Sequence, residues 1–150
     1  MTAARVTNRT DYAVRAVLYL SLQESERVVP IPEIAAETGL SVKFLEEILL
    51  LLRTAGIVQS RRGKQGGYSL LRPSRELRVA DVVQALEGDA PPSNEGEGME
   101  RHPFKEVAKG VFHAAAEAWW LQLTRARMSD LAEEVRRLET ERAGTVMFHI

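Results

Sequence analysis

The stretch from Ser41 to Tyr68 constrains the fold more than any other part of this chain. Its sequence, SVKFLEEILLLLRTAGIVQSRRGKQGGY, places a helix, a short apolar strand and a basic turn in direct succession. The turn Arg61–Gly67 holds three cations and three glycines, so it combines charge suited to phosphate with a backbone that can turn sharply. A helix followed closely by a positive hairpin tip is typical of compact domains that bind duplex DNA.

Two helical segments precede this stretch. The first is predicted over Thr10–Gln23, with Thr10 as its N-cap, and Val28–Pro30 follows as a short strand or an extended connection. The second is predicted over Pro32–Thr38 and ends at Gly39. Ser41 then caps a third helix that runs to about Ala55, so the two helices around Gly39 predict a helix-turn-helix. The third helix is expected to pack through Leu45, Ile48, Leu49 and Leu52.

The segments after the third helix predict a β-wing and then more helix. Ile57–Ser60 and Tyr68–Leu71 read as paired strands around the basic tip, and Ala80–Leu86 reads as a short helix. Asp89–Met99 is a linker by composition, rich in Pro, Gly and acidic residues. The fold class expected is therefore mostly α with a small β-wing.

The C-terminal part predicts two further helices. One spans about Phe104–Ala126, and Ser129 is expected to cap another that runs to about Glu141. No structure is predicted for the tail from Gly144. The expected organisation is a DNA-binding domain over 1–88, a linker over 89–102, a helical dimerisation region over 103–142 and a tail over 143–150.

Charge and composition exclude several classes of protein. The net charge of the 150 residues is −1, so any case for nucleic acid rests on local charge. Gln59–Arg78 supplies it, with six basic residues against Glu76 alone. The chain has no cysteine, which excludes disulfides and thiolate sites. No apolar run approaches the ~20 residues of a membrane helix, and the N-terminus lacks the apolar core of a signal peptide, so a cytoplasmic protein without membrane contact is expected.

Four runs of sequence carry a family resemblance. They are TDYAVRAVLYL, PIPEIAAETGLSVKFLEEIL, RTAGIVQSRRGKQGGYSLLRP and VADVVQALEG. Over about Thr10–Gly88 the chain resembles the Rrf2 family of bacterial transcription regulators. The resemblance implies a winged helix-turn-helix domain, a long dimerisation helix, and a homodimer on a palindromic promoter site, usually as a repressor. It also implies that Ser41, Lys43 and Glu46 address base edges and that Arg62 enters the neighbouring minor groove.

One departure from the family concerns the cofactor. Cluster-bearing members place three cysteines in the region that corresponds to Asp89–His102, and this chain has none. The residues of ligating type there are Glu95, Glu97, Glu100 and His102. Carboxylates and one imidazole are a poor match for the iron of an iron–sulfur cluster, so we expect no cluster and no other cofactor.

The candidate DNA-binding residues each have a plainer alternative. Arg61, Arg62 and Lys64 are expected to contact phosphate or a groove, although a solvated hairpin has the same composition. Gln65 either reads a base edge or faces water, and Lys43 contacts phosphate or is a surface lysine.

The roles of four further residues are also open. Glu46 either accepts a hydrogen bond from a cytosine amino group or is an exposed helix residue, whereas Ser41 can cap its helix and contact DNA together. Asn8 and Arg9, expected just before the first helix, either contact phosphate or belong to a frayed terminus.

The C-terminal helix offers the candidate dimer contacts. Its apolar side chains face more than one direction, which favours a partner beyond one small domain. Of the adjacent Trp119 and Trp120, one is expected in the core and the other at an interface. The three histidines are expected to be surface or packing residues. The predicted dimerisation residues are Val107, Val111, Phe112, Ala115, Trp119 and Leu123.

The sequence therefore predicts a DNA-binding transcriptional regulator that works as a homodimer on double-stranded DNA. The alternative is a winged-helix module that binds proteins and not DNA. No grouping of a nucleophile with a base, and no metal site, indicates an enzyme. A small-molecule effector, a partner protein and regulation by concentration alone all remain open.

Overall fold

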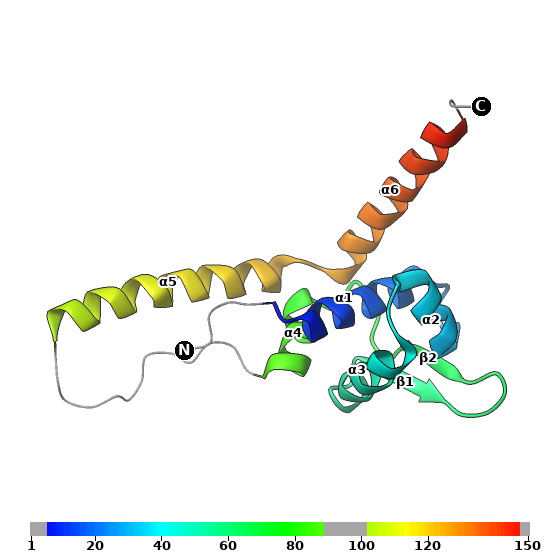
Figure 1. Ribbon diagram of the computed structural model, residues 1–150, viewed down its shortest axis with the longest axis horizontal. Coiled ribbons are helices and arrows are strands. Elements are labelled where there is room, and N and C mark those ends of the chain that lie inside the picture. Colours follow the sequence, from blue (N-terminus) through cyan, green and yellow to red (C-terminus); the bar gives the residue numbers. More distant parts are fainter. Residues whose placement is uncertain (1–5, 89–101, 148–150) are drawn as a thin grey trace.

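The computed structural model describes residues 6–88 and 102–147, and these ranges form six helices and one antiparallel strand pair (Figure 1). The predicted class, mostly α with a small β-wing, is confirmed. The elements are α1 (Asn8–Ser21), α2 (Ile31–Thr38), α3 (Val42–Thr54), β1 (Val58–Arg61), β2 (Gly67–Leu70), α4 (Val79–Glu87), α5 (Pro103–Arg125) and α6 (Met128–Met147).

The helix-turn-helix forms as its local signals predict. Gly39 ends α2 in the left-handed region, with φ of 72°, and its amide donates to the carbonyl of Ala35 at 3.0 Å. Ser41 caps α3 by accepting a hydrogen bond from the Phe44 amide at 3.2 Å. The predicted apolar stripe is confirmed as buried: Leu45, Ile48, Leu49 and Leu52.

One hydrophobic core lies beneath this motif. It takes side chains from α1, α2, α3, α4 and β1, from the segments that connect these elements, and from the start of α6. Its largest fully buried members include Ile34, Leu45, Ile57, Leu77 and Met128. Because α6 contributes to the same core, the last helix is fixed to the winged domain.

The start of α1 differs from the sequence-based prediction. Thr7, not Thr10, is the N-cap, and its hydroxyl oxygen accepts from the Thr10 amide at 3.2 Å. Asn8 and Arg9 consequently lie in the first turn and not before it. The two threonines have the same capping chemistry, and both hydroxyls also donate to Glu87 at the end of α4, a tertiary contact that the sequence does not reveal.

The junction between α5 and α6 is attached to the winged domain through its backbone. The amide of Met128 donates to Leu77 at 2.9 Å, and the amide of Val79 donates to Ala126 at 2.9 Å. Ser129 lies inside the first turn of α6, so the prediction that it caps this helix was wrong. Its amide instead donates to the carbonyl of Ser74 at 3.2 Å, a long-range bond that periodicity does not reveal.

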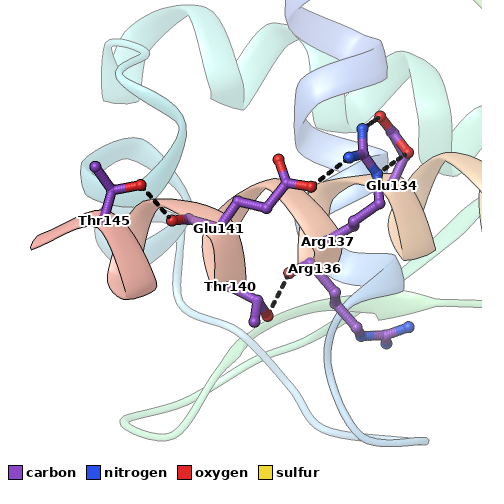
Figure 2. Close-up of polar contacts among 6 residues, drawn as sticks. All are labelled: Glu134, Arg136, Arg137, Thr140, Glu141 and Thr145. Atoms are coloured by element: carbon purple, nitrogen blue, oxygen red, sulfur yellow. Dashed lines mark hydrogen bonds and ion pairs between the residues drawn. The ribbon is translucent and has the colours of Figure 1, made fainter. Parts of the chain in front are cut away.

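Helix α6 is longer than predicted. It continues through Gly144 to Met147, so the prediction that no structure begins at Gly144 was wrong for the residues described. Figure 2 shows local polar contacts along α6: Arg137 pairs with Glu134 and, at 2.5 Å, with Glu141, and the Thr145 hydroxyl donates to the Glu141 carbonyl at 3.0 Å. Hydrogen bonding by Arg137 lowers the pKa of Glu134. Such pairs three and four residues apart stabilise an exposed helix.

None of the helices described is long and apolar enough to span a lipid bilayer. The predicted linker residues Asp89–Met99, and with them Glu95 and Glu97, lie outside the described ranges, as do Glu100 and His149.

Candidate nucleic-acid interface

The outer face of α3 carries the three residues predicted to address base edges. Ser41, Lys43 and Glu46 are all exposed, on the side of the helix that faces away from the buried leucines. Ser41 keeps its capping bond, and Lys43 is the second residue of the helix. The structure thus places these three side chains on the exposed surface of the first two turns of one helix.

The wing presents its cations at the end of a short, well-defined hairpin. Strands β1 and β2 pair in antiparallel register from Val58 opposite Leu70 to Arg61 opposite Gly67. The tip contains Arg62, Lys64 and Gln65, and all three are exposed together with Arg61. Within the described residues, the charged side chains of Arg61, Arg62 and Lys64 make no hydrogen bond and no ion pair. Their charge is therefore available to an external anion.

Glycine is required where this tip closes. The amide of Gly66 donates to the carbonyl of Gly63 at 3.0 Å, which turns the chain back toward β2. A Cβ atom added to Gly66 would lie 2.5 Å from the Arg61 carbonyl oxygen, a separation that no side chain tolerates. The tip is therefore a compact backbone turn from which the basic side chains project.

The wing is held at a fixed position relative to α3. The amide of Ile57 donates to the Leu52 carbonyl at 3.0 Å, directly after α3 ends. The Arg53 guanidinium donates to the Ser60 hydroxyl at 3.2 Å, linking the last turn of α3 to β1. Sequence reasoning missed this role for Arg53, because an exposed arginine near a helix C-terminus has no specific signature.

Residues Asn8 and Arg9 are exposed at the start of α1, beside α4 (Figure 1). The nearby Glu87 carboxylate accepts hydrogen bonds from Thr10 and Thr7, which lower its pKa, and the charge of Arg9 lowers it further. An anionic group thus already lies at this helix start. The structure places Asn8 and Arg9 in the first turn of α1, whereas the other candidate residues belong to α3, its N-cap and the wing.

Helix α5 exposes the side chains predicted for a dimer contact. In Figure 1 it extends away from the winged domain, and none of its described residues is buried. Exposed fractions reach 71% for Val107, 64% for Val111 and 55% for Phe112, and Ala115 is exposed as well. Trp119 and Leu123 are partly exposed.

The tryptophan pair does not divide between core and surface. Trp119 and Trp120 are both partly exposed, with ring centroids 6.3 Å apart, so the prediction that one lies in the core was wrong. Helix α5 contributes no side chain to the hydrophobic core, which leaves both rings on the outside. The Nε2 atom of His113 lies 3.2 Å from the Oε1 atom of Glu117, one turn farther along α5, so His113 makes a surface contact.

The donor set does not suit an iron–sulfur cluster. The chain contains no cysteine, and no group of three His, Cys, Asp or Glu side chains is arranged for a metal ion within residues 6–88 and 102–147. His102 is exposed just before α5, and the centroid of its ring lies 5.7 Å from that of Phe104. Without thiolates the ligands that such clusters require are missing.

Comparison with known proteins identifies relatives along most of the chain. The profile of the Rrf2 family, described as an iron-dependent transcriptional regulator, matches residues 6–134. The protein Rrf2 of Nitratidesulfovibrio vulgaris is 33% identical over 132 residues, which cover 87% of this chain and 88% of that protein. An HTH-type transcriptional regulator of Mycobacterium tuberculosis is 42% identical over 84 residues, 56% of this chain, and the match spans about half of that relative, 52%.

A solved structure has a similar fold. The oxidised form of CymR from Staphylococcus aureus superimposes with a TM-score of 0.71 at 28% sequence identity, over 86% of this chain and 96% of that one.

Proposed function

Because this chain belongs to the Rrf2 family of transcriptional regulators, we propose that it binds DNA sequence-specifically and regulates transcription, with residues 1–88 as the DNA-binding domain. One observation carries the proposal. The wing, which carries the unpaired cations at its tip, is linked to α3, which carries the exposed polar face, by the backbone bond between Ile57 and Leu52 and by the Arg53–Ser60 contact.

In the proposed binding mode, α3 and the wing contact different parts of the DNA. The N-terminal turns of α3 enter the major groove, where Ser41 and Glu46 reach base edges and Lys43 contacts phosphate. The tip follows the neighbouring backbone, with Arg62 in the minor groove and Arg61, Lys64 and Gln65 beside it. The exposed side chains of Asn8 and Arg9 add phosphate contacts near the start of α1.

The dimer in this proposal forms through the C-terminal helices. Val107, Val111 and Phe112 expose more than half of their surface on α5, which is costly unless a partner covers them. A second copy of the chain supplies an equivalent face, and the twofold symmetry of such a pair matches a palindromic site. Residues 103–142 thus act as the dimerisation region, and the dimer represses by occupying its promoter.

In this proposal, regulation does not involve an iron–sulfur cluster. Neutral, carboxylate and imidazole side chains stand where cluster-bearing relatives have cysteines, and the proposal includes no step that passes through a metal. A signal would instead act through a small molecule, a partner protein or the concentration of the regulator itself.

Selection of binding sites from a random duplex library, followed by sequencing, tests the proposal. We expect a recovered motif with twofold symmetry, bound by a dimer, and an affinity that falls steeply as salt rises. The purified chain would have to remain monomeric and bind no duplex in dilute buffer for the proposal to fail. In that case the protein-binding alternative would explain the winged domain.

A further inference from the structure

Large apolar side chains are exposed on α3 more than elsewhere in the winged domain. Among the described residues 6–88, five large hydrophobic side chains are exposed, and three of them belong to this 13-residue helix. They are Val42, Phe44 and Leu50, with exposed fractions of 41%, 52% and 50%. Single exposed hydrophobic residues are ordinary, but a concentration on the helix that is proposed to enter DNA requires an explanation.

Phe44 is the largest of the three, and it is the only aromatic residue of α3. It is the third residue of α3, and its own amide donates to the Ser41 cap at 3.2 Å. Helical side chains tilt toward the N-terminus, so the ring projects over the end of the helix that leads into the groove. At ~100° per residue it flanks Lys43, the predicted polar contact.

A second ring supports Phe44 from α1. Tyr12 lies 6.2 Å from it, centroid to centroid, in a tilted arrangement, and the Arg15 guanidinium lies 5.7 Å from the Tyr12 ring on the same helix. Tyr12 thus lies beside the Phe44 ring, about half of whose surface stays open. A ring that already packs against a neighbour loses less side-chain entropy when its open side contacts an apolar group.

We propose that Phe44 contacts the 5-methyl group of a thymine in each half-site and so determines part of the sequence specificity. This inference rests on the proposed DNA-binding function. The thymine methyl is the apolar group that base pairs display in the major groove, and phenylalanine is among the side chains that contact it. The surrounding charge fits the same ligand, because Lys43 lies beside Phe44 and the wing tip adds three unpaired cations.

Replacement of thymine by deoxyuridine tests this contact, because it removes the methyl group and leaves every hydrogen-bonding atom in place. The duplex is the site recovered by selection, substituted one thymine at a time on each strand. We expect one symmetric pair of positions at which the unmodified protein loses roughly three- to fivefold in affinity, as one buried methyl group implies. Equal affinity at all positions would overturn the inference without any variant being made.

A variant assigns the effect to this ring. Phe44→Ala should bind the thymine duplex more weakly and should no longer distinguish thymine from deoxyuridine at that pair of positions. Leu50→Ala is the matched control, because Leu50 is equally exposed on the same helix but lies ~9 Å farther from its N-terminus. It should keep the discrimination. Persistent discrimination in a folded Phe44→Ala protein would overturn the assignment.

These outcomes separate the two proposals. A chain that binds no duplex at all contradicts the proposed function. A chain that binds its selected site tightly, yet is indifferent to the thymine methyl groups, contradicts only the role of Phe44.

Discussion

Val29 and Tyr68 exchange two backbone hydrogen bonds, Val29 N–H to Tyr68 O at 2.8 Å and Tyr68 N–H to Val29 O at 2.9 Å. The connection between α1 and α2 thus pairs with the wing as an isolated bridge beside β2. Arg27 and Glu33, 2.8 Å apart, stabilise this connection, and the Tyr19 hydroxyl donates to the same carboxylate at 2.7 Å. The wing is therefore fixed on one side by α3 and on the other by the loop after α1.

Gly67→Ala should disrupt this bridge. A Cβ atom at this position would lie 2.1 Å from the Val29 carbonyl oxygen, so the two segments must separate. We expect a loss of roughly 1–3 kcal/mol in the free energy of unfolding, and weaker DNA binding because the wing is no longer fixed. Urea unfolding and fluorescence anisotropy measure the two effects.

The control for that substitution is Gly144→Ala. Gly144 lies within α6, and a Cβ atom there meets nothing within 4 Å. Alanine has the higher helix propensity, so this variant should be unchanged or slightly more stable. Equal behaviour of the two variants would show that the Val29–Tyr68 contact does not fix the wing.

Arg62→Ala should reduce specific DNA binding by ~1–3 kcal/mol if the guanidinium contacts a groove or phosphate. The dependence of affinity on salt should also become shallower, by about one phosphate contact per half-site. Arg142→Ala removes the same charge from an exposed position on α6, far from the wing in Figure 1, and should bind normally. Matching dissociation constants for all three proteins at equal salt would remove Arg62 from the interface.

Two methionines of α6 provide a matched test of how the C-terminal helices attach to the winged domain. Met128 is fully buried in the core, whereas Met147 is 79% exposed at the other end of the same helix. Met128→Ala should cost about 2–5 kcal/mol of unfolding free energy, through lost burial and the cavity that remains. Met147→Ala should change it by less than about 0.5 kcal/mol. Similar unfolding midpoints would contradict the packing of Met128.

The winged domain was predictable because its signals are local. The caps at Ser41 and Gly39, the buried stripe of α3 and the glycine-rich turn all act within a few residues, and each formed as expected. The positive charge of the wing could also be predicted from the sequence, because it depends only on the composition of one short segment. The hypothesis about its role in binding DNA came from the same residues.

What the sequence did not reveal depends on contacts between distant segments. At the start of α1, Thr7 and Thr10 both donate to Glu87, which lies 80 residues after Thr7 in the chain, and the amide of Ser129 bonds to Ser74. The Val29 bridge and the burial of Met128 also join segments that no periodicity connects. Helix α6 also continues past its predicted end at about Glu141, through Gly144 to Met147.

Val111→Asp should weaken the proposed dimer. Val111 is 64% exposed on α5, and a carboxylate there cannot be buried against an apolar partner without a large desolvation penalty. We expect the dimer dissociation constant to rise by at least about tenfold in analytical ultracentrifugation. Val146→Asp is the control, because Val146 is 65% exposed but lies on α6. A dimer that tolerates the first change and not the second would place the interface on α6.

Protonation of Glu87 should weaken the attachment of α1 to α4 in acid. Hydrogen bonds from Thr10 and Thr7 lower the pKa of this carboxyl below its usual value of 4.5, so the folded state favours the ionised form. Its contribution to stability is therefore complete above about pH 4.5 and is lost as the pH falls through the lower folded-state pKa.

Glu87→Gln should accordingly be less stable than the unmodified protein at neutral pH, with a smaller further loss in acid. Some acid sensitivity remains, because hydrogen bonds also lower the pKa of Glu33 and of Glu134. Urea unfolding at neutral pH and at steps below about pH 4.5 measures the difference. Glu139→Gln removes the same charge from an exposed position on α6 and should follow the unmodified protein. An acid loss of equal size in all three proteins would mean that the threonine contacts do not stabilise the ionised carboxylate.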